Sequence, residues 1–358
     1  MKIIINCNDC FAAYTFRLPL IKRLQQKHDV YVVAGFDGYT RLLKEEGIKV
    51  IISKVEATST NVFQDCNLIR FYKRTFRKIE PDVLINYTLK PHLYGSYAAF
   101  KNTRVINFVS GTSSIFIKRN LLFYLIRFMY QLIAKKVDYY IFLNKDDCFE
   151  FKQLKILKQP YSIINSEGVA LDRFYPDIDF KKPLTFIFVG RLVKEKGIVE
   201  YLEAAQIVKN KYPDVRFLVV GGFYQKKSAV SKKIIDEYHQ NEIIEYLGYR
   251  YDINEVLKDV HCVVLPSYRE GMPISLIEGL ASKKVIIASD VIGCREVVKN
   301  GYNGFLVKPK SSFDLANKLE EYINYPNKET LHHQALLSSK QYDVAKITDK
   351  LVDIIENI

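Results

Sequence analysis

The sequence predicts an α/β protein with two domains, each a parallel sheet covered by helices. Short apolar runs alternate with amphipathic segments along all 358 residues, which is typical of parallel strands joined by helices. The length suits two domains of ordinary size, and 48% hydrophobic residues supply a sizeable core. A polar stretch containing Pro176 and Pro183 interrupts the alternation near the middle, and we place the domain boundary there.

The first half alternates strands and helices from its first residues. A polar loop, residues 7–15, follows the first strand at the carboxyl end, where open α/β sheets bind ligands. No G-x-G-x-x-G is present, so nothing favours a nicotinamide cofactor. The expected strands are 2–6, 30–34, 50–52, 83–86, 105–109, 138–143 and 162–165, and the expected helices are 16–28, 39–46, 68–79 and 145–155.

The second half repeats this alternation and ends in a helix. Ile347, Leu351, Ile354 and Ile358 recur at helical spacing in that last segment. The expected strands are 185–189, 216–220, 261–265 and 285–289, followed by a turn and strand at 300–307. The expected helices are 198–210, 273–281 and 312–323.

The net charge of +13 is concentrated in the first half. Residues 1–170 carry 26 Lys and Arg against 14 Asp and Glu, whereas residues 171–358 carry 27 against 26. This asymmetry predicts an anionic partner for the first domain, either nucleic acid or a membrane surface. No stretch of 18 apolar residues occurs, so no membrane span is expected. The six cysteines lack zinc-site spacing, and we expect reduced thiols in a cytoplasmic protein.

A basic helix at 68–79 is the first candidate for a membrane surface. Arg70, Arg74 and Arg77 share one face, and aromatic residues lie between the charges. A face that is simply solvated is the other interpretation.

The segment 118–136, KRNLLFYLIRFMYQLIAKK, is the second candidate. Lys118 and Arg119 precede an apolar, aromatic run that is too short and too charged to span a bilayer. It could lie in the interface, with Phe123 on the lipid side. A core helix of the first domain is the competing interpretation, and a helix that is partly core and partly at the membrane surface would satisfy both.

Residues 266–279, PSYREGMPISLIEG, hold two glutamates with seven residues between them. Glu270 lies in a loop before a helix that begins at Pro273, and Glu278 lies one to two turns into that helix. The helix start would offer free N–H groups and a positive dipole end to a phosphate. The residues expected around that phosphate are Gly271, Met272, Pro273 and Ile274. A surface loop with two solvated acids is the alternative.

This arrangement resembles the E-x7-E signature of retaining glycosyltransferases of the GT-B fold, family 4. The resemblance extends from about Thr185 to Tyr322, including GRLVKEKG at 190–197 and NGYNGFLV at 300–307. It implies two Rossmann-like domains that face each other across a cleft, with a terminal helix crossing back onto the first. The resulting domains are 1–170, a linker at 171–183, a nucleotide-sugar domain at 184–340 and the returning helix at 341–358.

The resemblance implies that a UDP-sugar donor binds in the second domain as a co-substrate. Arg191 and Lys196 match the family's arginine and lysine for the donor diphosphate, whose charge they would offset. Gly190 lets the backbone turn at the strand end. Glu270 would contact and orient the transferred sugar, and Glu278 would accept hydrogen bonds from the ribose hydroxyls.

Neither a metal ion nor another cofactor is expected. The two cations and the helix N-terminus would stabilise the departing diphosphate in place of a metal. Asp177-Ile178-Asp179 matches the D-x-D pattern of metal-dependent glycosyltransferases, but we discount it because it is short and lies in the linker. Backbone groups near Gly248 and Tyr249 would contact the nucleotide base.

A looser resemblance in the first half points to the bacterial subgroup that extends lipid-linked oligosaccharides. Lys90 is a candidate for the acceptor diphosphate, or else a surface lysine before a helix. Gly111 and Thr112 correspond to the subgroup's glycine-rich turn near the reaction centre. Arg17 and His92 complete the acceptor-side candidates, although a lone histidine is more often structural.

The predicted function is retaining transfer of GalNAc or GlcNAc from a UDP-sugar to a polyprenyl-diphosphate-linked saccharide. The enzyme would be peripheral, at the cytoplasmic face of the inner membrane, on an anionic membrane surface. The alternatives are another hexose donor for lipopolysaccharide or capsule, a UDP-sugar 2-epimerase, and a basic nucleic-acid-binding protein. No recognition motif supports the last, so no nucleic-acid partner is expected.

Overall fold

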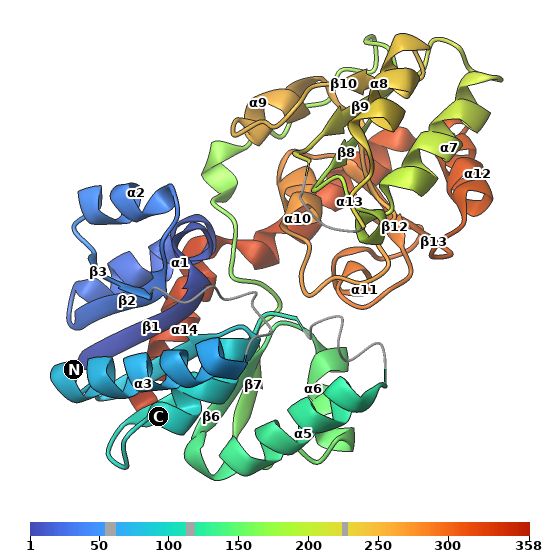
Figure 1. Ribbon diagram of the computed structural model, residues 1–358. Helices are drawn as coiled ribbons and strands as arrows, with labels where there is room; N and C mark the ends of the chain where they lie inside the picture. Colours follow the sequence, from blue (N-terminus) through green and yellow to red (C-terminus); the bar gives the residue numbers. More distant parts are fainter. Residues whose placement is uncertain (54–61, 112–118, 224–227) are drawn as a thin grey trace. The chain divides into compact units, whose positions relative to one another are not determined.

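The computed structural model describes residues 1–53, 62–111, 119–223 and 228–358 (Figure 1). The chain divides into two compact units, residues 1–168 with 344–358 and residues 169–343. Each unit is built on a parallel sheet with helices packed against it, so the predicted α/β class is confirmed.

The sheet of the first unit has the order β3-β2-β1-β4-β5-β6-β7, and every neighbouring pair is parallel. From β1 the chain moves outward to β3 and then returns to add β4 on the other side. Open sheets of this kind bind ligands at the carboxyl ends of the two strands that flank the reversal. The strands are β1 (Lys2–Asp9), β2 (Asp29–Gly35), β3 (Lys49–Ser53), β4 (Val83–Tyr87), β5 (Arg104–Val109), β6 (Tyr139–Phe142) and β7 (Tyr161–Ile163).

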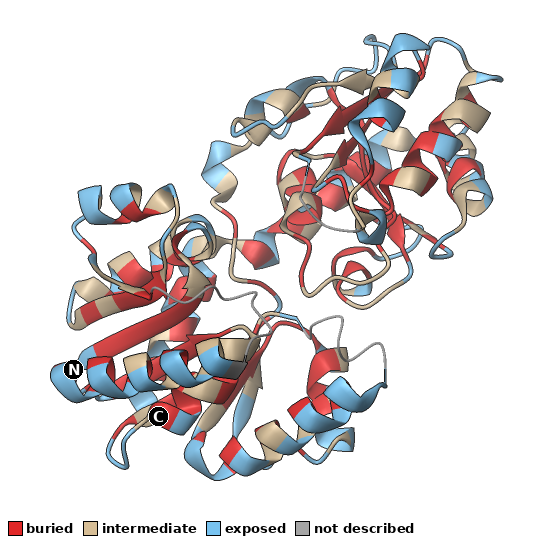
Figure 2. Cartoon of the chain, viewed as in Figure 1, coloured by how far each residue is buried: buried red, intermediate tan, exposed pale blue. Residues whose placement is uncertain are grey.

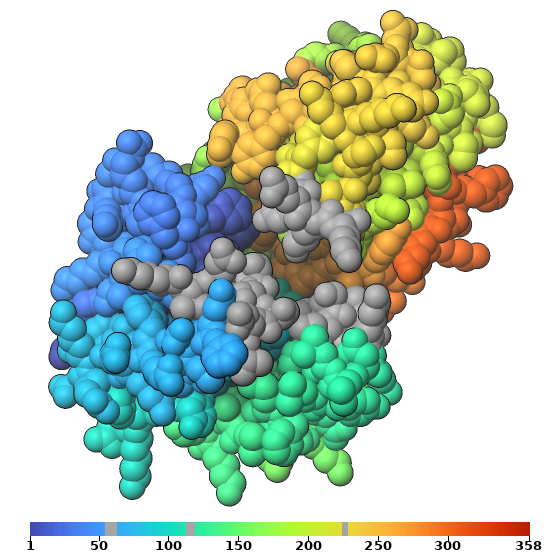
Figure 3. Space-filling model, in the orientation of Figure 1, coloured from blue at the N-terminus to red at the C-terminus, as the bar shows by residue number. Residues whose placement is uncertain are grey.

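Helices cover both faces of this sheet, whose central strands are almost wholly buried (Figure 2). One face carries α3 (Val62–Ile79), the π-turn Pro91–Gly95, α4 (Ser96–Ala98), α5 (Leu121–Ile133) and α6 (Lys145–Gln153), which share one hydrophobic core. The other carries α1 (Cys10–Gln25), α2 (Tyr39–Glu45) and α14 (Val344–Asn357). Helices α3, α5 and α6 form much of the surface of the first unit that is in view in Figure 3.

The prediction of a polar loop at residues 7–15 is wrong. Strand β1 continues to Asp9, which pairs with Gly35 after a shift in register, and α1 begins at Cys10. The Asp9 carboxylate accepts a hydrogen bond from the Ala12 backbone N–H at 2.8 Å, so Asp9 caps the helix. A capped start within an alanine-containing segment favours a helix over a loop.

The sheet of the second unit has the order β10-β9-β8-β11-β12-β13 and is also parallel throughout. Its reversal lies between β8 and β11. The strands are β8 (Thr185–Val189), β9 (Arg216–Val220), β10 (Glu245–Tyr246), β11 (Cys262–Leu265), β12 (Val285–Ser289) and β13 (Gly304–Val307). Its helices are α7 (Ile198–Lys209), α8 (Lys232–Gln240), α9 (Ile253–Val256), α10 (Ile274–Ala281), α11 (Cys294–Val297), α12 (Ser312–Ile323) and α13 (Lys328–Ser339). Helix α7 packs against α12, and α10 against α13.

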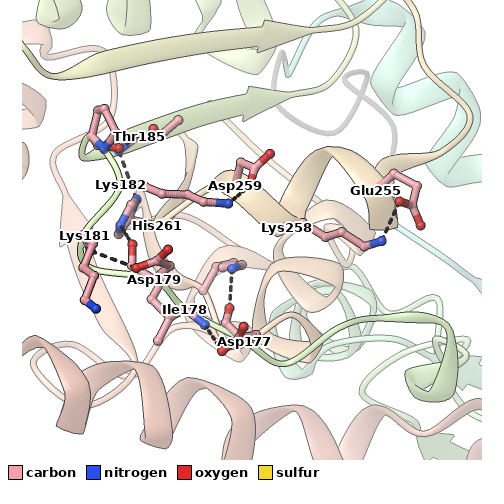
Figure 4. Close-up of polar contacts among 12 residues, drawn as sticks. Asp177, Ile178, Asp179, Lys181, Lys182, Thr185, Glu255, Lys258, Asp259 and His261 are labelled. Atoms are coloured by element: carbon pink, nitrogen blue, oxygen red, sulfur yellow. Dashed lines mark hydrogen bonds and ion pairs between the residues drawn. The ribbon is translucent and has the colours of Figure 1, made fainter.

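Residues 171–183, the predicted linker, belong to the second unit (Figure 4). The buried Lys284 ammonium donates a hydrogen bond to the Asp177 carbonyl at 2.6 Å. His261 lies with Nε2 3.2 Å from the Asp179 carbonyl oxygen. A buried lysine and a buried histidine therefore fix this polar segment against the amino end of the sheet.

The predicted returning helix is confirmed, because α14 packs on α1 in the first unit. Arg23 and Asp349 form an ion pair at 3.0 Å on this contact. The chain enters α14 beside Gly168, whose φ is +92° and whose β-carbon position lies 2.5 Å from the Val344 α-carbon. Only glycine fits this point.

Candidate active site

The predicted donor residues of the second unit gather in loops that follow β8 and β11. Gly190 and Arg191 come directly after β8, and residues 266–273 come directly after β11. These strands flank the reversal of strand order, so their carboxyl ends are the expected place for a ligand. The strand order therefore explains why segments about 75 residues apart in the sequence meet here.

The two loops approach each other closely at Gly197. Its φ is +74°, and a β-carbon there would lie 2.0 Å from the Pro266 carbonyl oxygen. The contact continues with a hydrogen bond from the Tyr268 N–H to the Glu195 carbonyl at 2.9 Å. Any larger residue at 197 would separate the loops, so this glycine sets the distance between their side chains.

Lys196 and Glu270 form the central contact of the site. The Lys196 Nζ lies 2.6 Å from the Glu270 Oε1, and the two side chains are 20% and 10% exposed. Ser267 Oγ donates to the same oxygen at 2.6 Å. Two donors therefore fix one carboxylate oxygen by charge-assisted hydrogen bonds, and Oε2 takes part in neither bond. Lys196 and Glu270 are predicted from the sequence, whereas Ser267, only three residues before Glu270, is not.

The neighbouring loop after β12 fixes the backbone at Glu270. The Glu270 N–H donates to the Ile292 carbonyl at 3.2 Å. Gly293 has φ +81°, and a β-carbon there would come within 2.7 Å of the carbonyl oxygens of Glu270 and Gly271. This support is not predicted from the sequence, since a lone glycine before a short helix is a weak signal.

Helix α10 begins one residue later than predicted, at Ile274, with the mostly buried Pro273 preceding it. Its first N–H groups have no partner within the helix, so this end suits an anion. Met272, in the turn before it, is buried. The structure thus places Gly271, Met272, Pro273 and Ile274 at the helix start, as the sequence predicts.

Glu278 lies on the second turn of α10. The residue is only partly buried by its exposed area, yet the protein packed around the carboxyl raises its pKa to about 7, and Arg173 opposes this rise. Because the surrounding protein excludes water from the carboxylate, hydrogen bonds from hydroxyl donors would stabilise its charged form.

The remaining donor-side candidates lie on accessible loops. Arg191 is exposed at the end of β8. The Gly248 carbonyl accepts a hydrogen bond from the Gly221 N–H at 2.9 Å. Tyr249 is 54% exposed and packs edge-to-face on Tyr251, with ring centroids 4.8 Å apart. An exposed aromatic ring of this kind can stack on a planar base.

Lys90, in the first unit, already has a carboxylate partner. Its Nζ lies 2.8 Å from an Asp65 oxygen, and the Tyr94 hydroxyl donates to the other Asp65 oxygen at 2.8 Å. An acceptor diphosphate would therefore compete with Asp65 for this lysine. Asp65 is not predicted from the sequence as a partner, because it lies 25 residues away at the start of α3.

Arg17 and His92 are buried and form hydrogen bonds within the first unit, which argues against the predicted acceptor contacts. Arg17 is 4% exposed, lies 3.1 Å from Glu167 and stacks over the Tyr87 ring at 4.3 Å. His92 is 3% exposed, with its ring nitrogens 2.9 Å from the Tyr130 hydroxyl and 3.1 Å from the Phe108 carbonyl. Burial lowers the pKa of His92 to about 4, so the ring is neutral at pH 7.

Gly111 lies exposed just after β5, with φ +138°, and its neighbour Thr112 lies outside the described residues.

Of the predicted membrane-facing residues that the structure describes, one is buried and the others are exposed. Phe123 is 3% exposed and packs into the core of the first unit, so its predicted lipid contact is wrong. The prediction assigned the wrong face of α5, because both faces of that helix are apolar. Arg70, Arg74 and Arg77 are exposed on α3, and Arg119 is exposed before α5. Lys118 lies outside the described residues.

The described residues contain neither a membrane-spanning helix nor a grouped set of metal ligands. None of their helices combines the length and the apolar character needed to cross a bilayer. No three of their His, Cys, Asp and Glu residues are grouped to share a metal ion. In the discounted D-x-D segment, the Asp177 and Asp179 carboxylates accept hydrogen bonds from neighbouring backbone N–H groups at 2.8 and 2.9 Å.

Two family models match the chain, one in each half. Residues 175–335 match "Glycosyl transferases group 1", and residues 7–144 match "Glycosyl transferase 4-like". The site described above lies inside the first match.

Two curated relatives are similar over most of their length. The N,N'-diacetylbacillosaminyl-diphospho-undecaprenol alpha-1,3-N-acetylgalactosaminyltransferase of Campylobacter jejuni is 29% identical, over 96% of each chain. The UDP-Gal:alpha-D-GlcNAc-diphosphoundecaprenol alpha-1,3-galactosyltransferase of Escherichia coli is 27% identical, over 92% of this chain and 89% of its own.

The fold is similar to that of two solved structures. The structure of HepE from Anabaena in complex with UDP matches with a TM-score of 0.81 and 19% identity, over 100% of both chains. A glycosyltransferase from Rickettsia africae matches with a TM-score of 0.79 and 17% identity, over 99% of this chain and 98% of its own. These matches confirm the predicted GT-B fold.

Proposed function

Because the chain belongs to the family 4 glycosyltransferases of the GT-B fold, we propose that it transfers an N-acetylhexosamine, GalNAc or GlcNAc, from a UDP-sugar to a saccharide on a polyprenyl diphosphate. The observation that carries the proposal is the Lys196–Glu270 pair beside the start of α10, with Glu278 on the second turn of that helix. This set offers a cation, an anion-binding helix end and two carboxylates in one place.

The donor diphosphate is the first group to be placed. Lys196 and the free N–H groups of α10 would bind its oxygens, and Arg191 would add a second cation from the end of β8. As the sugar–phosphate bond breaks, negative charge grows on the departing UDP. Groups already aimed at that charge stabilise the transition state more than the ground state. In this proposal they do the work for which other glycosyltransferases use a metal ion, so none is required.

The two glutamates take different roles because their surroundings differ. Glu278, in its desolvated position, would accept hydrogen bonds from the ribose hydroxyls. Glu270, whose Oε1 is fixed by Lys196 and Ser267, would present Oε2 to hydroxyls of the transferred sugar. The resemblance in this segment supports transfer with retention of the anomeric configuration.

The acceptor is assigned to the first unit. The name of the Campylobacter relative describes N-acetylgalactosamine transfer to an undecaprenyl-diphosphate-linked sugar, and the name of the E. coli relative describes galactose transfer to another. These names support a lipid-linked acceptor here. Lys90 and Gly111 remain the candidates for its diphosphate and sugar. A lipid-linked acceptor and the basic first half together support a peripheral position at the cytoplasmic face of the inner membrane.

The test begins with thermal unfolding of the purified protein in a panel of UDP-, GDP- and TDP-sugars. A ligand that binds only the folded state raises the melting temperature, and we expect a rise with UDP-GalNAc or UDP-GlcNAc. The responding sugar is then incubated with a polyprenyl-diphosphate-linked acceptor, and the linkage is read by NMR. An α-linked product from an α-linked donor supports the proposal, and a β-linked product rejects retention.

Other functions give different results in the same assays. A response to UDP-galactose or UDP-glucose alone would favour a hexose transferase, as the name of the E. coli relative suggests for that protein. Formation of a 2-epimer from UDP-GlcNAc without acceptor would favour an epimerase. Salt-dependent binding to DNA, with no response to any nucleotide sugar, would favour nucleic-acid binding.

A further inference from the structure

Helix α5 has apolar side chains on two opposite faces. Phe123, Ile126, Tyr130 and Ile133 pack into the core of the first unit and are at most 5% exposed. Leu121, Leu125, Phe128 and Leu132 recur at spacings of four, three and four, so they share one stripe on the opposite side. Their side chains are 86%, 53%, 56% and 62% exposed. We call these four residues the outer stripe.

A stripe of this size calls for a partner. Single exposed apolar residues are ordinary on protein surfaces, but a contiguous row on one helix marks an interaction site. Tyr124 and Leu122 on its two sides are 53% and 45% exposed, which widens the apolar surface. The row also lies on a helix too short to cross a bilayer, so its apolar side chains can only lie along a membrane or against a protein.

A basic hollow lies beside the outer stripe. It measures about 460 Å³ between α5 and the end of α6, and it is lined by Arg119, Phe123, Tyr124, Arg127, Gln153 and Leu154. Arg127 is held in place because its Nε donates to the Leu154 carbonyl at 3.1 Å. In the part of the chain that the structure describes, the two Nη groups of Arg127 make no further hydrogen bond or ion pair. We call this site the α5–α6 hollow.

A second pair of cations lies at the other end of α5. Lys73 of α3 and Lys136 both lie over the Tyr97 ring, with ammonium groups 4.9 and 5.2 Å from its centroid. Burial, and then the charge of Lys73, lower the pKa of Lys136. An anion between these two like charges would relieve their repulsion. Cations therefore flank the outer stripe at both ends, and Figure 3 shows α3, α5 and α6 on one face of the first unit.

The charge around the stripe has one dominant sign. Residues 119–158 hold eight Lys and Arg and four Asp and Glu. Of those acids, Asp147 is buried, and Asp138 accepts a hydrogen bond from the Val105 N–H at 2.7 Å. An apolar stripe flanked by cations complements an anionic bilayer, whose headgroups lie beside its acyl chains. A second copy of this chain would instead bring like charges together.

We propose that the outer stripe inserts into an anionic membrane surface and that the α5–α6 hollow binds the phosphate of a lipid headgroup. The inference rests on the proposed function in one respect, because a lipid-linked acceptor requires the enzyme at a bilayer. It adds a specific surface and a headgroup site in which Arg119 and Arg127 contact the phosphate. Phe123, which the sequence placed on the lipid side, instead anchors α5 to the core beneath them.

The test is sedimentation of the full-length protein with vesicles, without donor or acceptor. Vesicles of phosphatidylcholine alone are compared with vesicles that also contain phosphatidylglycerol. We expect binding only to the anionic vesicles, and weaker binding as salt is raised. Binding to neither vesicle, or equal binding to both, overturns the proposal.

Two double variants test the two parts of the surface. Leu125→Ser with Phe128→Ser removes apolar area, and we expect vesicle affinity to fall about tenfold or more. The control is Phe313→Ser, at a 68% exposed phenylalanine of the second unit. Arg119→Gln with Arg127→Gln removes two charges, and we expect a fall of about tenfold. The charge-matched control is Arg41→Gln with Lys44→Gln on α2, which covers the other face of the sheet.

The outcomes are separable. Vesicle binding unchanged in both double variants overturns the proposal. So does a change of oligomeric state caused by the stripe variant in lipid-free solution, because the stripe would then be an interface between copies. If soluble glycerol phosphate quenches the protein's fluorescence or shifts its melting temperature, and the protein does not bind vesicles, the hollow would be reassigned to a free phosphate. Melting curves of the variants, recorded with UDP, show whether a variant loses vesicle binding only because it is unfolded. Sugar transfer without vesicle binding would remove this inference and leave the proposed function standing.

Discussion

The Lys196 ammonium and the Glu270 carboxylate lie 2.6 Å apart in the loops after β8 and β11. The sequence predicts both as site residues but contains no indication that they are in contact. The charges of Lys196 and Glu270 neutralise each other, so a donor diphosphate must compete with Glu270 for the lysine. A lysine that moves from the carboxylate to the diphosphate would couple donor binding to the freedom of Glu270 to contact the sugar.

Replacing Lys196 should abolish transfer while the fold persists. In Lys196→Ala the diphosphate loses a cation, and Glu270 is left partly buried without its counter-charge. We expect kcat to fall by about a hundredfold or more, since removal of one preorganised donor to a developing charge has that effect. Initial rates at saturating donor measure it. Lys194→Ala is the matched control, because Lys194 is exposed in the same short turn. Equal rates in the two variants would remove Lys196 from the site.

Replacing Glu278 should weaken donor binding and stabilise the fold at high pH. Glu278→Gln loses a charged acceptor for the ribose hydroxyls, so the donor KM should rise about tenfold or more. The same change removes a charge that is costly to bury. Titration with UDP separates the two effects, and Glu203→Gln, at an exposed carboxylate of α7, is the control.

The pH dependence of both effects follows from the raised pKa of Glu278, about 7 against an ordinary 4.5. Between those values the unfolded chain releases the proton first, so the contribution of Glu278 to stability is present below pH 4.5 and is lost as pH rises through 7. The Gln variant should therefore be more stable than the parent at pH 8, by about 3 kcal/mol, and similar to it near pH 4.5. Donor affinity of the parent should weaken as pH falls below 7. Denaturant unfolding at the two pH values would contradict this if the difference did not change.

The buried Arg17–Glu167 pair should matter for stability rather than for the acceptor. Arg17→Met leaves Glu167 buried without its partner, at a cost of about 3 kcal/mol or more in the free energy of unfolding. Burial raises the pKa of Glu167 and Arg17 opposes that rise, so loss of Arg17 should raise this pKa further. Arg17→Met with Glu167→Gln should recover part of the loss. Full stability with an increased acceptor KM would restore Arg17 as an acceptor contact.

His92 should make the first unit sensitive to acid. Its pKa is lowered to about 4 by burial, from an ordinary 6.5. The unfolded chain takes up the proton first as pH falls, so the stability due to the neutral ring is present above 6.5 and is lost as pH falls towards 4. His92→Gln should flatten this dependence by about 2 kcal/mol in denaturant unfolding at pH 7 and pH 5. The exposed His333→Gln serves as control, and identical pH profiles for all three proteins would refute the assignment.

Much of the architecture was predictable because strands and helices carry local signals. Apolar runs identified the central strands of both sheets, and helical spacing identified α7, α12 and α14 to within a few residues. The failures occurred where a contact from elsewhere decided the outcome. Asp9 pairs with Gly35 and caps α1, which turned an expected loop into strand and helix. The segment 171–183 reads as a linker because it is polar, but buried Lys284 and His261 fix it to the second unit.

The candidate site divides in the same way. The sequence by itself determined which residue types stand after β8 and β11 and at the start of α10, because those are properties of short segments. Only the tertiary structure decided that Lys196 meets Glu270, that Ser267 shares its oxygen, and that Arg17 and His92 are enclosed in the core. It also decided which apolar face of α5 is exposed. Pairing and burial depend on what a distant segment places opposite a side chain, and a local pattern does not contain that information.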